Sequence, residues 1–304
     1  MTRYLVAAGL CVLPALALAQ TTPPELFTPW GHPDLQGTWS YATVTPLQRP
    51  AALGDKAYYT PEEAEQARLR AEDESVDIPG DPIGWYEKGD VMPDLRTSLI
   101  VDPADGRLPL TEFAREQQAA LNAYRRDHLA DTWLDRTTWD RCIMYHGVPP
   151  VSTGYNNSFM ILQTPDTVAI YSETIHDVRI IPLDGRPPLH DRIRQWNGSS
   201  RGHWEGDTLV VETTNYSDKT ELRFPSSSQT RAVERFTRIS EDEIDYSFTI
   251  EDPLIYTQPW TAMRPLPRLD DYIIYEYACH EGNRSLYNLL RGARLQEQQA
   301  EAAP

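Results

Sequence analysis

The chain has 304 residues, with 45 acidic against 28 basic side chains and a formal net charge of −17. A chain this acidic lacks the Lys and Arg surface that phosphate contacts need, which argues against nucleic-acid binding. The length corresponds to one large domain, or to one domain with an elaborated arm.

Met1 to Ala19 predicts a secretory signal peptide. Arg3 supplies the positive start, Tyr4 to Leu18 is almost entirely apolar, and Ala17-Leu18-Ala19 offers a cleavage site. A membrane anchor is the alternative, but the apolar run is shorter than the roughly 20 residues that a spanning helix needs. No later segment is apolar enough over that length, so we expect no membrane span and a periplasmic or secreted protein.

Cysteine usage agrees with export. Cleavage removes Cys11 and leaves Cys142 and Cys279. In an oxidising compartment, two remaining cysteines predict one disulfide, which would join the start of the main β region to its end. The alternative is a pair of free thiols with a redox or metal-binding role.

Residues 20–141 predict an arm that wraps the main domain. Gly37 to Tyr41 reads as a short strand with a Gly-x-Trp pattern, which in lipocalins lies on the first strand and plugs the closed end of the barrel. Thr60 followed by Pro61 and Glu63 predicts the capped start of a helix that runs to about Ala71.

The rest of the arm predicts a strand and two further helical segments. Ser98 to Val101 is a short strand before a turn, and Trp133 to Trp139 brackets a short helical segment. Between them, Thr111 caps a helix that reaches about His128. We expect three apolar side chains of that helix to face inward: Phe113, Leu121 and Tyr124.

Residues 142–294 predict the main β domain, because apolar residues alternate with polar ones from Phe159 onward. The same face of a long strand pair is expected to carry Ile170, Val178 and Ile180. Tight turns at Glu205–Thr208 and at Ser240–Glu243 predict two hairpins.

Tyr272 to Cys279 predicts the last strand, Ser285 to Arg294 a short closing helix, and residues 295–304 a disordered tail. Short strands without intervening helices indicate an antiparallel meander, and closure into a barrel removes exposed edges. We therefore expect a mainly β fold, an antiparallel lipocalin-like β-barrel from about Tyr155 to Cys279, with an N-terminal helical and loop-rich wrapping arm.

Four long motifs carry a resemblance: Trp30 to Trp39, Ile175 to Pro187, Arg201 to Glu212, and Tyr275 to Asn283. Over nearly the whole chain after the signal peptide, the sequence resembles a large family of exported, uncharacterised bacterial proteins common in soil and oligotrophic bacteria. The resemblance implies a lipocalin-like barrel and brings no reaction with it.

Four histidines lie in or beside the β region, and a closed meander can bring several of them to one cavity: His146, His176, His203 and His280. We predict that His176 and His203 titrate during catalysis, with Glu205 and Arg179 as partners. His203 and Glu205 share one face of a strand, so that imidazole and carboxylate can meet. The alternative is a structural polar network without catalysis.

Hydroxyl, amide and aromatic groups nearby predict a ligand site. Tyr155 and Asn157 are the expected anchors, and the expected walls are Tyr171, Trp204 and Tyr275; turn formation and core packing are the alternatives. No nucleotide-binding glycine loop, Gly-x-Ser-x-Gly or Cys-x-x-Cys motif is present, so we expect no organic cofactor. The four histidines lack the close spacing typical of zinc sites, which disfavours a metal without excluding one.

These observations favour an exported protein that acts on a small molecule. The first hypothesis is a cofactor-independent acid–base enzyme, a lyase, isomerase or hydrolase, with its site in a barrel cavity. The second is a non-catalytic lipocalin-like carrier of a small, partly apolar ligand. A third class, a structural or interaction module, predicts no cavity. The oligomeric state has no signature in the sequence.

Overall fold

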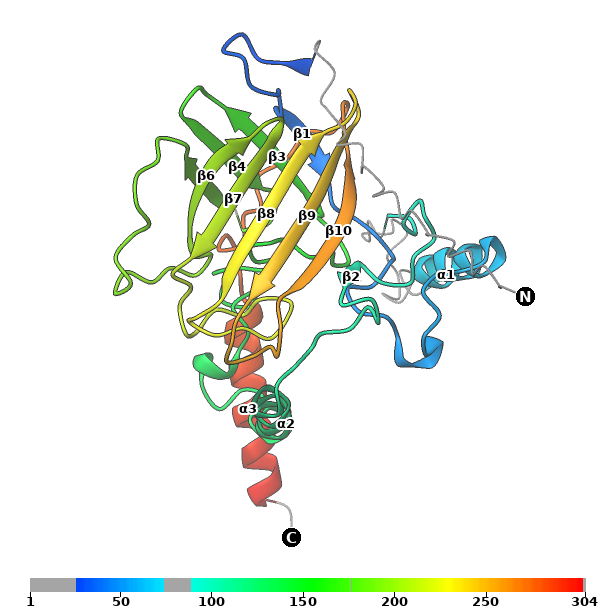
Figure 1. Cartoon of the computed structure of the whole chain (residues 1–304). Coiled ribbons are helices and arrows are strands. Elements are labelled where there is room, and N and C mark those ends of the chain that lie inside the picture. The colour runs from blue at the N-terminus through cyan, green and yellow to red at the C-terminus, as the bar shows by residue number, and fades with distance from the viewer. Residues whose placement is uncertain (1–25, 74–88, 176, 303–304) are drawn as a thin grey trace, which may run out of the picture.

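Two antiparallel sheets form the body of the protein, with helices of the arm and of the C-terminus to one side (Figure 1). The computed structural model describes residues 26–73, 89–175 and 177–302. The predicted signal peptide, Met1 to Ala19, lies outside the described residues.

Each strand is antiparallel to its hydrogen-bonded neighbours. The four-stranded sheet contains, in spatial order, β1 (Gly37–Ser40), β3 (Ser158–Gln163), β4 (Thr167–Ser172) and β5 (Val178–Pro182). The six-stranded sheet contains, in spatial order, β2 (Ile100–Asp102), β10 (Trp260–Pro267), β9 (Glu243–Glu251), β8 (Arg231–Arg238), β7 (Thr208–Thr214) and β6 (Ser199–Glu205). The mainly β, antiparallel architecture and both predicted hairpins are confirmed.

The predicted closed barrel is not observed. No backbone ladder joins β5 to β6 among the described residues. Instead, the side chain of Arg179 reaches from β5 to the hydroxyl of Ser200 on β6, 2.8 Å away. On the other side of the sheets, Trp39 on β1 forms an isolated bridge with Arg268, just after β10. The two sheets therefore meet through side chains and an isolated bridge, not through a continuous ladder.

The core lies between the two sheets. Inward residues of β1 and β3 meet those of β8, β9 and β10, and the largest fully buried side chains include Trp39, Tyr246 and Trp260. Burying one such side chain contributes about 1.5–3 kcal/mol. Trp39 belongs to the Gly-x-Trp pattern: its ring lies under the guanidinium groups of Arg238 and Arg268 and donates a 2.9 Å hydrogen bond to the Leu35 carbonyl.

The arm contains the predicted helices. In α1 (Pro61–Asp73), the Glu63 amide donates to the Thr60 hydroxyl at 3.3 Å and the Glu63 carboxylate accepts from the Thr60 amide at 2.8 Å, as a capping box requires. In α2 (Glu112–Asp127), the Thr111 hydroxyl accepts from the Ala114 amide. Two short 3-10 turns complete the arm: η2 (Ala51–Leu53) and η4 (Trp133–Asp135).

The predicted inward face of α2 is wrong. Phe113, Leu121 and Tyr124 are 43%, 42% and 47% exposed, and only Ala114 of this helix is buried. The helix lies beside the sheets rather than across them (Figure 1), and of its residues Ala114 alone belongs to the main core. No helix in the described ranges is long and apolar enough to cross a membrane.

Two predictions for the C-terminal part are also wrong. Tyr272 to Cys279 forms no strand, and Ile273 and Tyr275 are 67% and 75% exposed. Both edges of β10 are already occupied, by β9 and β2, so this segment has no strand to pair with there. Residues 295–302, predicted to be disordered, continue α3 (Ser285–Ala302), which buries no side chain.

The predicted disulfide between Cys142 and Cys279 is confirmed, with the two Cα atoms 5.7 Å apart. It fastens the segment after β10 to the loop that precedes β3. The hydroxyl of Tyr272 adds a second attachment, because it donates to the buried carboxylate of Glu173. The C-terminal segment is therefore held by side chains instead of by strand pairing.

Candidate functional site

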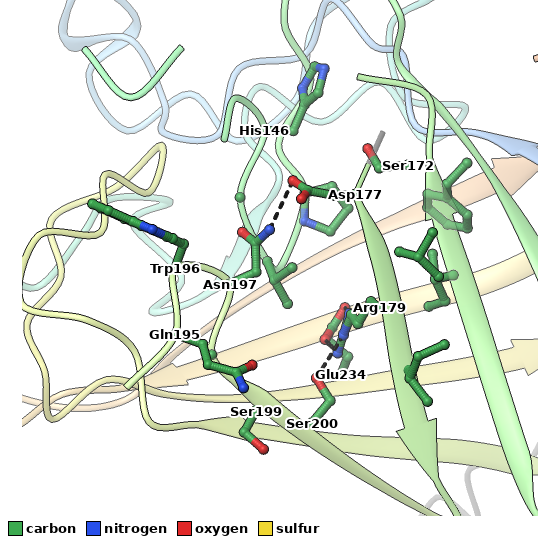
Figure 2. Close-up of a pocket in the computed structure, with 18 of the residues that line it drawn as sticks. His146, Ser172, Asp177, Arg179, Gln195, Trp196, Asn197, Ser199, Ser200 and Glu234 are labelled. Atoms are coloured by element: carbon green, nitrogen blue, oxygen red, sulfur yellow. Dashed lines mark hydrogen bonds and ion pairs between the residues drawn. The ribbon is translucent and has the colours of Figure 1, made fainter. Parts of the chain in front are cut away.

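A cavity of about 540 Å³ lies at the unpaired junction of the two sheets. It is lined by residues from both faces of the two edge strands. On β5, Val178 and Ile180 belong to the outer face and Arg179 to the inner face. On β6, Ser199 and Arg201 belong to the outer face and Ser200 to the inner face. The cavity therefore passes between the strands, from the core side to the long β5–β6 loop. Figure 2 shows part of its wall.

A strained turn between β4 and β5 shapes the upper wall. Ile175 has a φ of +58°, a conformation that is rare for a β-branched residue. The Ser172 amide donates a 2.9 Å hydrogen bond to the Asp177 carbonyl and closes the turn. The turn thereby places Asp177 on the cavity wall. Strain of this kind is concentrated at functional sites.

The same turn reverses part of the predicted face assignment. Ile170 lies opposite Arg179 in the ladder, so these two side chains share the inner face. Val178 and Ile180 are each 55% exposed and lie on the outer face. The prediction that Ile170 shares a face with Val178 and Ile180 is wrong, because the turn pairs even-numbered residues of β4 with odd-numbered residues of β5.

Asp177 and Asn197 form a polar pair in the cavity (Figure 2). The Asn197 amide nitrogen donates to the Asp177 carboxylate at 3.0 Å. Because an ionised carboxylate only accepts, this contact fixes the orientation of the amide. The Asn197 side-chain oxygen is buried and has no hydrogen-bond partner among the described residues. A buried acceptor without a donor costs about 1–3 kcal/mol, which a ligand N–H or O–H can recover.

Arg179 and Glu234 form a charge-balanced network at the inner end. The guanidinium donates to both Glu234 oxygens, to Ser200 at 2.8 Å and to Thr213 at 3.0 Å, and Tyr246 donates to Glu234 at 2.8 Å. Although burial disfavours its charge, the adjacent Glu234 carboxylate raises the pKa of Arg179. Every carboxylate oxygen has a donor, so the network is a fixed part of the wall and a poor candidate for proton transfer.

His146 lines the cavity in a neutral state. Its ring packs against Tyr41 and Tyr145, at centroid distances of 5.2 and 4.6 Å, and its Nδ1 lies 3.2 Å from the Val151 carbonyl. Burial lowers the pKa of His146 to about 3, against the opposing effect of the Val151 and Asn156 carbonyls. A histidine with this pKa carries no charge near neutrality and cannot serve as an acid there.

Of the predicted catalytic residues, Arg179 lines the cavity, and His176 lies outside the described residues. His203 and Glu205 meet as expected, with Nε2 and Oε1 3.2 Å apart, but on the outer face of β6, where their side chains are 59% and 49% exposed. A hydrogen bond from Arg235, assisted by one from His203, lowers the pKa of Glu205. Neither residue lines the cavity: Ser199 and Arg201 share their face of β6 and do line it, whereas His203 and Glu205 lie further along the strand, next to the turn into β7.

The five predicted ligand residues lie elsewhere. Asn157 is fully buried and exchanges two hydrogen bonds with the Thr153 backbone, at 2.7 and 2.8 Å, which is the turn-forming alternative. Trp204 stacks on His32 with centroids 4.9 Å apart. None of the five predicted ligand residues lines the cavity: Tyr155, Asn157, Tyr171, Trp204 and Tyr275.

Sequence reasoning missed Asn197 and Glu234. A signal for Glu234 was present: the inward positions of β8 are Ala232, Glu234, Phe236 and Arg238, so a carboxylate stands between two apolar residues on the buried face. Asn197-Gly198 reads as an ordinary turn dipeptide, and nothing local shows that the turn borders a cavity.

Within the described ranges, no group of three or more His, Cys, Asp or Glu side chains is arranged to hold a metal ion. Comparison with protein-family models, with curated proteins and with solved structures gives no match for this chain.

Proposed function

We propose that this protein is an exported, cofactor-independent enzyme that binds a small, partly apolar molecule in the β5–β6 cavity and transfers a proton on it. Asp177 is the general base in this proposal, and Asn197 orients both the carboxylate and the substrate. The reaction class is a lyase, an isomerase or a hydrolase. The observation that carries the proposal is the Asp177–Asn197 pair on the cavity wall, with the unsatisfied Asn197 oxygen beside it.

The cavity's size and lining support small-molecule binding. Its volume of about 540 Å³ falls within the range of roughly 300–1,000 Å³ typical of ligand sites. Its inner end is walled by Tyr41, Phe159, Ile170 and Phe236, whereas Asp177 and Asn197 supply polar contacts. Apolar walls with a few polar groups at fixed positions are what orients a bound substrate.

Asp177 is the best-placed base among the described cavity residues. Burial lowers the pKa of His146 to about 3, so its ring resists taking up a proton, and Glu234 is committed to Arg179 and Tyr246. The Asp177 carboxylate lines the cavity and is held there by the hydrogen bond from the Asn197 amide. The strained backbone at Ile175 further supports a functional role for this turn.

A non-catalytic carrier is the second candidate, and the satisfied Arg179–Glu234 network favours it. A fixed, charge-balanced wall and one unsatisfied amide oxygen are enough to anchor a ligand without any chemistry.

The proposal places the protein in the periplasm or outside the cell. The signal-peptide pattern of Met1 to Ala19 and the Cys142–Cys279 disulfide support this location. A lipocalin-like ancestry and membership of the resembled family of exported bacterial proteins are part of the same proposal. The buried Trp39 of the Gly-x-Trp pattern, beside the bridge from β1 to Arg268, supports them.

The test is proton exchange in deuterium oxide. Residues 20–304 of the chain are incubated with a mixture of hydroxylated and carbonyl-bearing aromatic compounds of the kind found in soil. Mass spectrometry then records deuterium incorporation and the loss of each compound. We expect the wild type to change at least one compound, and Asp177→Asn to be about 10²–10⁴-fold slower, the usual range for losing a general base.

Glu205→Gln is the matched control, because it removes a carboxylate of the outer face of β6 and leaves the cavity intact. Full activity in Asp177→Asn would overturn the assignment of the base. Loss of activity in Glu205→Gln alone would instead support the His203–Glu205 pair, predicted from the sequence, as the catalytic residues. Binding without change of any compound would favour the carrier.

A further inference from the structure

We infer that the molecule bound in the β5–β6 cavity carries a single negative charge, of the carboxylate type, and that Arg201 recognises it. The inference rests on the proposed small-molecule site and adds the chemical class of its ligand: an apolar or ring-bearing monoanion. It concerns a residue that no part of the proton-transfer proposal uses.

The charges on the cavity wall lead to Arg201. Three arginines line the cavity, but Arg179 is neutralised by Glu234 and Arg186 by Asp184. Arg201 is the remaining cation, and it forms no ion pair within the described part of the chain. The acidic residue opposite Arg201 in the ladder, Glu212, forms its ion pair with Arg231 instead, so no direct ion pair compensates the charge of Arg201 in the described part of the chain.

The guanidinium of Arg201 is held in place by neutral groups. Its Nε donates to the Pro187 carbonyl at 3.1 Å, and its Nη1 donates to the Ser200 carbonyl at 2.7 Å and to the Ser199 hydroxyl at 3.3 Å. These contacts come from the β5–β6 loop and from β6 itself, so they fix the plane of the group. Nη2 makes no hydrogen bond to any described residue and remains for a ligand.

The position of Arg201 sets the ligand's shape. It lies on the outer face of β6, at the loop end of the cavity, whereas Tyr41, Phe159 and Phe236 wall the inner end. A ligand that spans the gap would place an apolar body inside and a charged group outside. A planar guanidinium pairs well with a planar carboxylate, and one cation balances one negative charge.

Two fluorescent probes with the same aromatic body test the inference. Anilinonaphthalene sulfonate carries one negative charge, and N-phenylnaphthylamine is its uncharged counterpart. Each is titrated into the wild type, Arg201→Gln and Arg235→Gln at low and at moderate salt. Arg235→Gln is the matched control. It also removes one arginine charge, but Arg235 pairs with Glu205 and does not line the cavity.

We expect Arg201→Gln to weaken binding of the sulfonate about tenfold, the usual effect of losing one charge-assisted hydrogen bond. Binding of N-phenylnaphthylamine should be unchanged, and Arg235→Gln should affect neither probe. Salt should weaken only the sulfonate, and only when Arg201 is present.

Each contrary result has a separate meaning. If neither probe binds the wild type, the proposed cavity site itself is wrong. If both probes bind and Arg201→Gln alters neither, or alters both equally, the site stands and anion recognition by Arg201 is overturned. An equal loss of sulfonate binding in Arg235→Gln also overturns it, because the general surface charge would then be responsible.

Discussion

Burial, more than residue type, decides which side chains of the cavity can do chemistry. Glu234 and Asp177 are both carboxylates, but Glu234 is fully buried and bound by Arg179 and Tyr246, whereas Asp177 borders the cavity beside Asn197. Removing one member of a buried ion pair leaves an uncompensated charge. Glu234 therefore has a structural role, as the partner of Arg179 in the cavity wall. Asp177 lines the cavity and is the proposed contact for a substrate.

His146 provides the first prediction at this scale, a pH dependence of stability. Its pKa is about 3 in the folded protein and about 6.5 when unfolded, so between these values the unfolded chain binds one more proton. Stability from this residue is therefore present above pH 6.5 and lost as the pH falls. Urea unfolding at pH 7.5 and pH 5.0 should show a loss of about 2 kcal/mol that His146→Gln lacks.

Glutamine keeps a polar side chain at position 146 but cannot gain a proton, so it isolates the titration from packing. His203→Gln, an exposed histidine, is the control and should keep the wild-type pH dependence. An identical loss between the two pH values in wild type and His146→Gln would show that other groups cause it.

At the scale of elements, the start of β6 fixes the cavity. Gly198 stands between Asn197 and Ser199 with a φ of +67°, and a Cβ there would lie 2.7 Å from both the Thr214 carbonyl oxygen and a Thr213 methyl carbon. The backbone oxygen belongs to a paired strand and cannot move aside. Only glycine therefore lets the chain turn into β6 while Asn197 reaches Asp177.

Gly198→Ala tests this account. The left-handed backbone alone costs about 1–2 kcal/mol, and the contact with the Thr214 oxygen adds to it. Gly206→Ala, at the other end of β6, has a φ of +59° with nothing within 4 Å of its Cβ and bears only the backbone cost. We expect Gly198→Ala to lose at least about 1 kcal/mol more in urea unfolding, and to bind N-phenylnaphthylamine less tightly. Equal losses in both variants would show that the close approach does not matter.

At the scale of the whole molecule, the disulfide joins parts that the sheets leave separate. Cys142 precedes the loop that contributes His146 and Pro150 to the cavity, and Cys279 lies 137 residues further along the chain. Because the segment after Arg268 pairs with no strand, the disulfide and the Tyr272–Glu173 hydrogen bond hold it against the body.

Replacing both cysteines by serine should lower the free energy of unfolding by about 5 kcal/mol, the loop-entropy value for a closed loop of this length. Thiol titration of the unfolded, non-reduced wild type should find no free thiol among Cys142 and Cys279. Two titratable thiols, or a double variant as stable as the wild type, would contradict the structural role of the bond.

Local sequence patterns alone determined several elements. The capped helix starts at Thr60 and Thr111 and the turns at Glu205–Thr208 and Ser240–Glu243 depend on residues within a few positions of each other. The disulfide followed from the fact that only Cys142 and Cys279 remain after the predicted cleavage. The helix starts and the turns are readable because neighbouring residues supply nearly all of their energy.

Only the tertiary structure decided whether the sheets close and which side chains share the cavity. At the β5–β6 junction, the side-chain contact between Arg179 and Ser200, 21 residues apart, stands where a closed barrel would have a backbone ladder. The face assignment depends on the register across the strained turn at Ile175, where a shift of one position exchanges inside and outside. Both are set by long-range packing, which no short stretch of sequence contains.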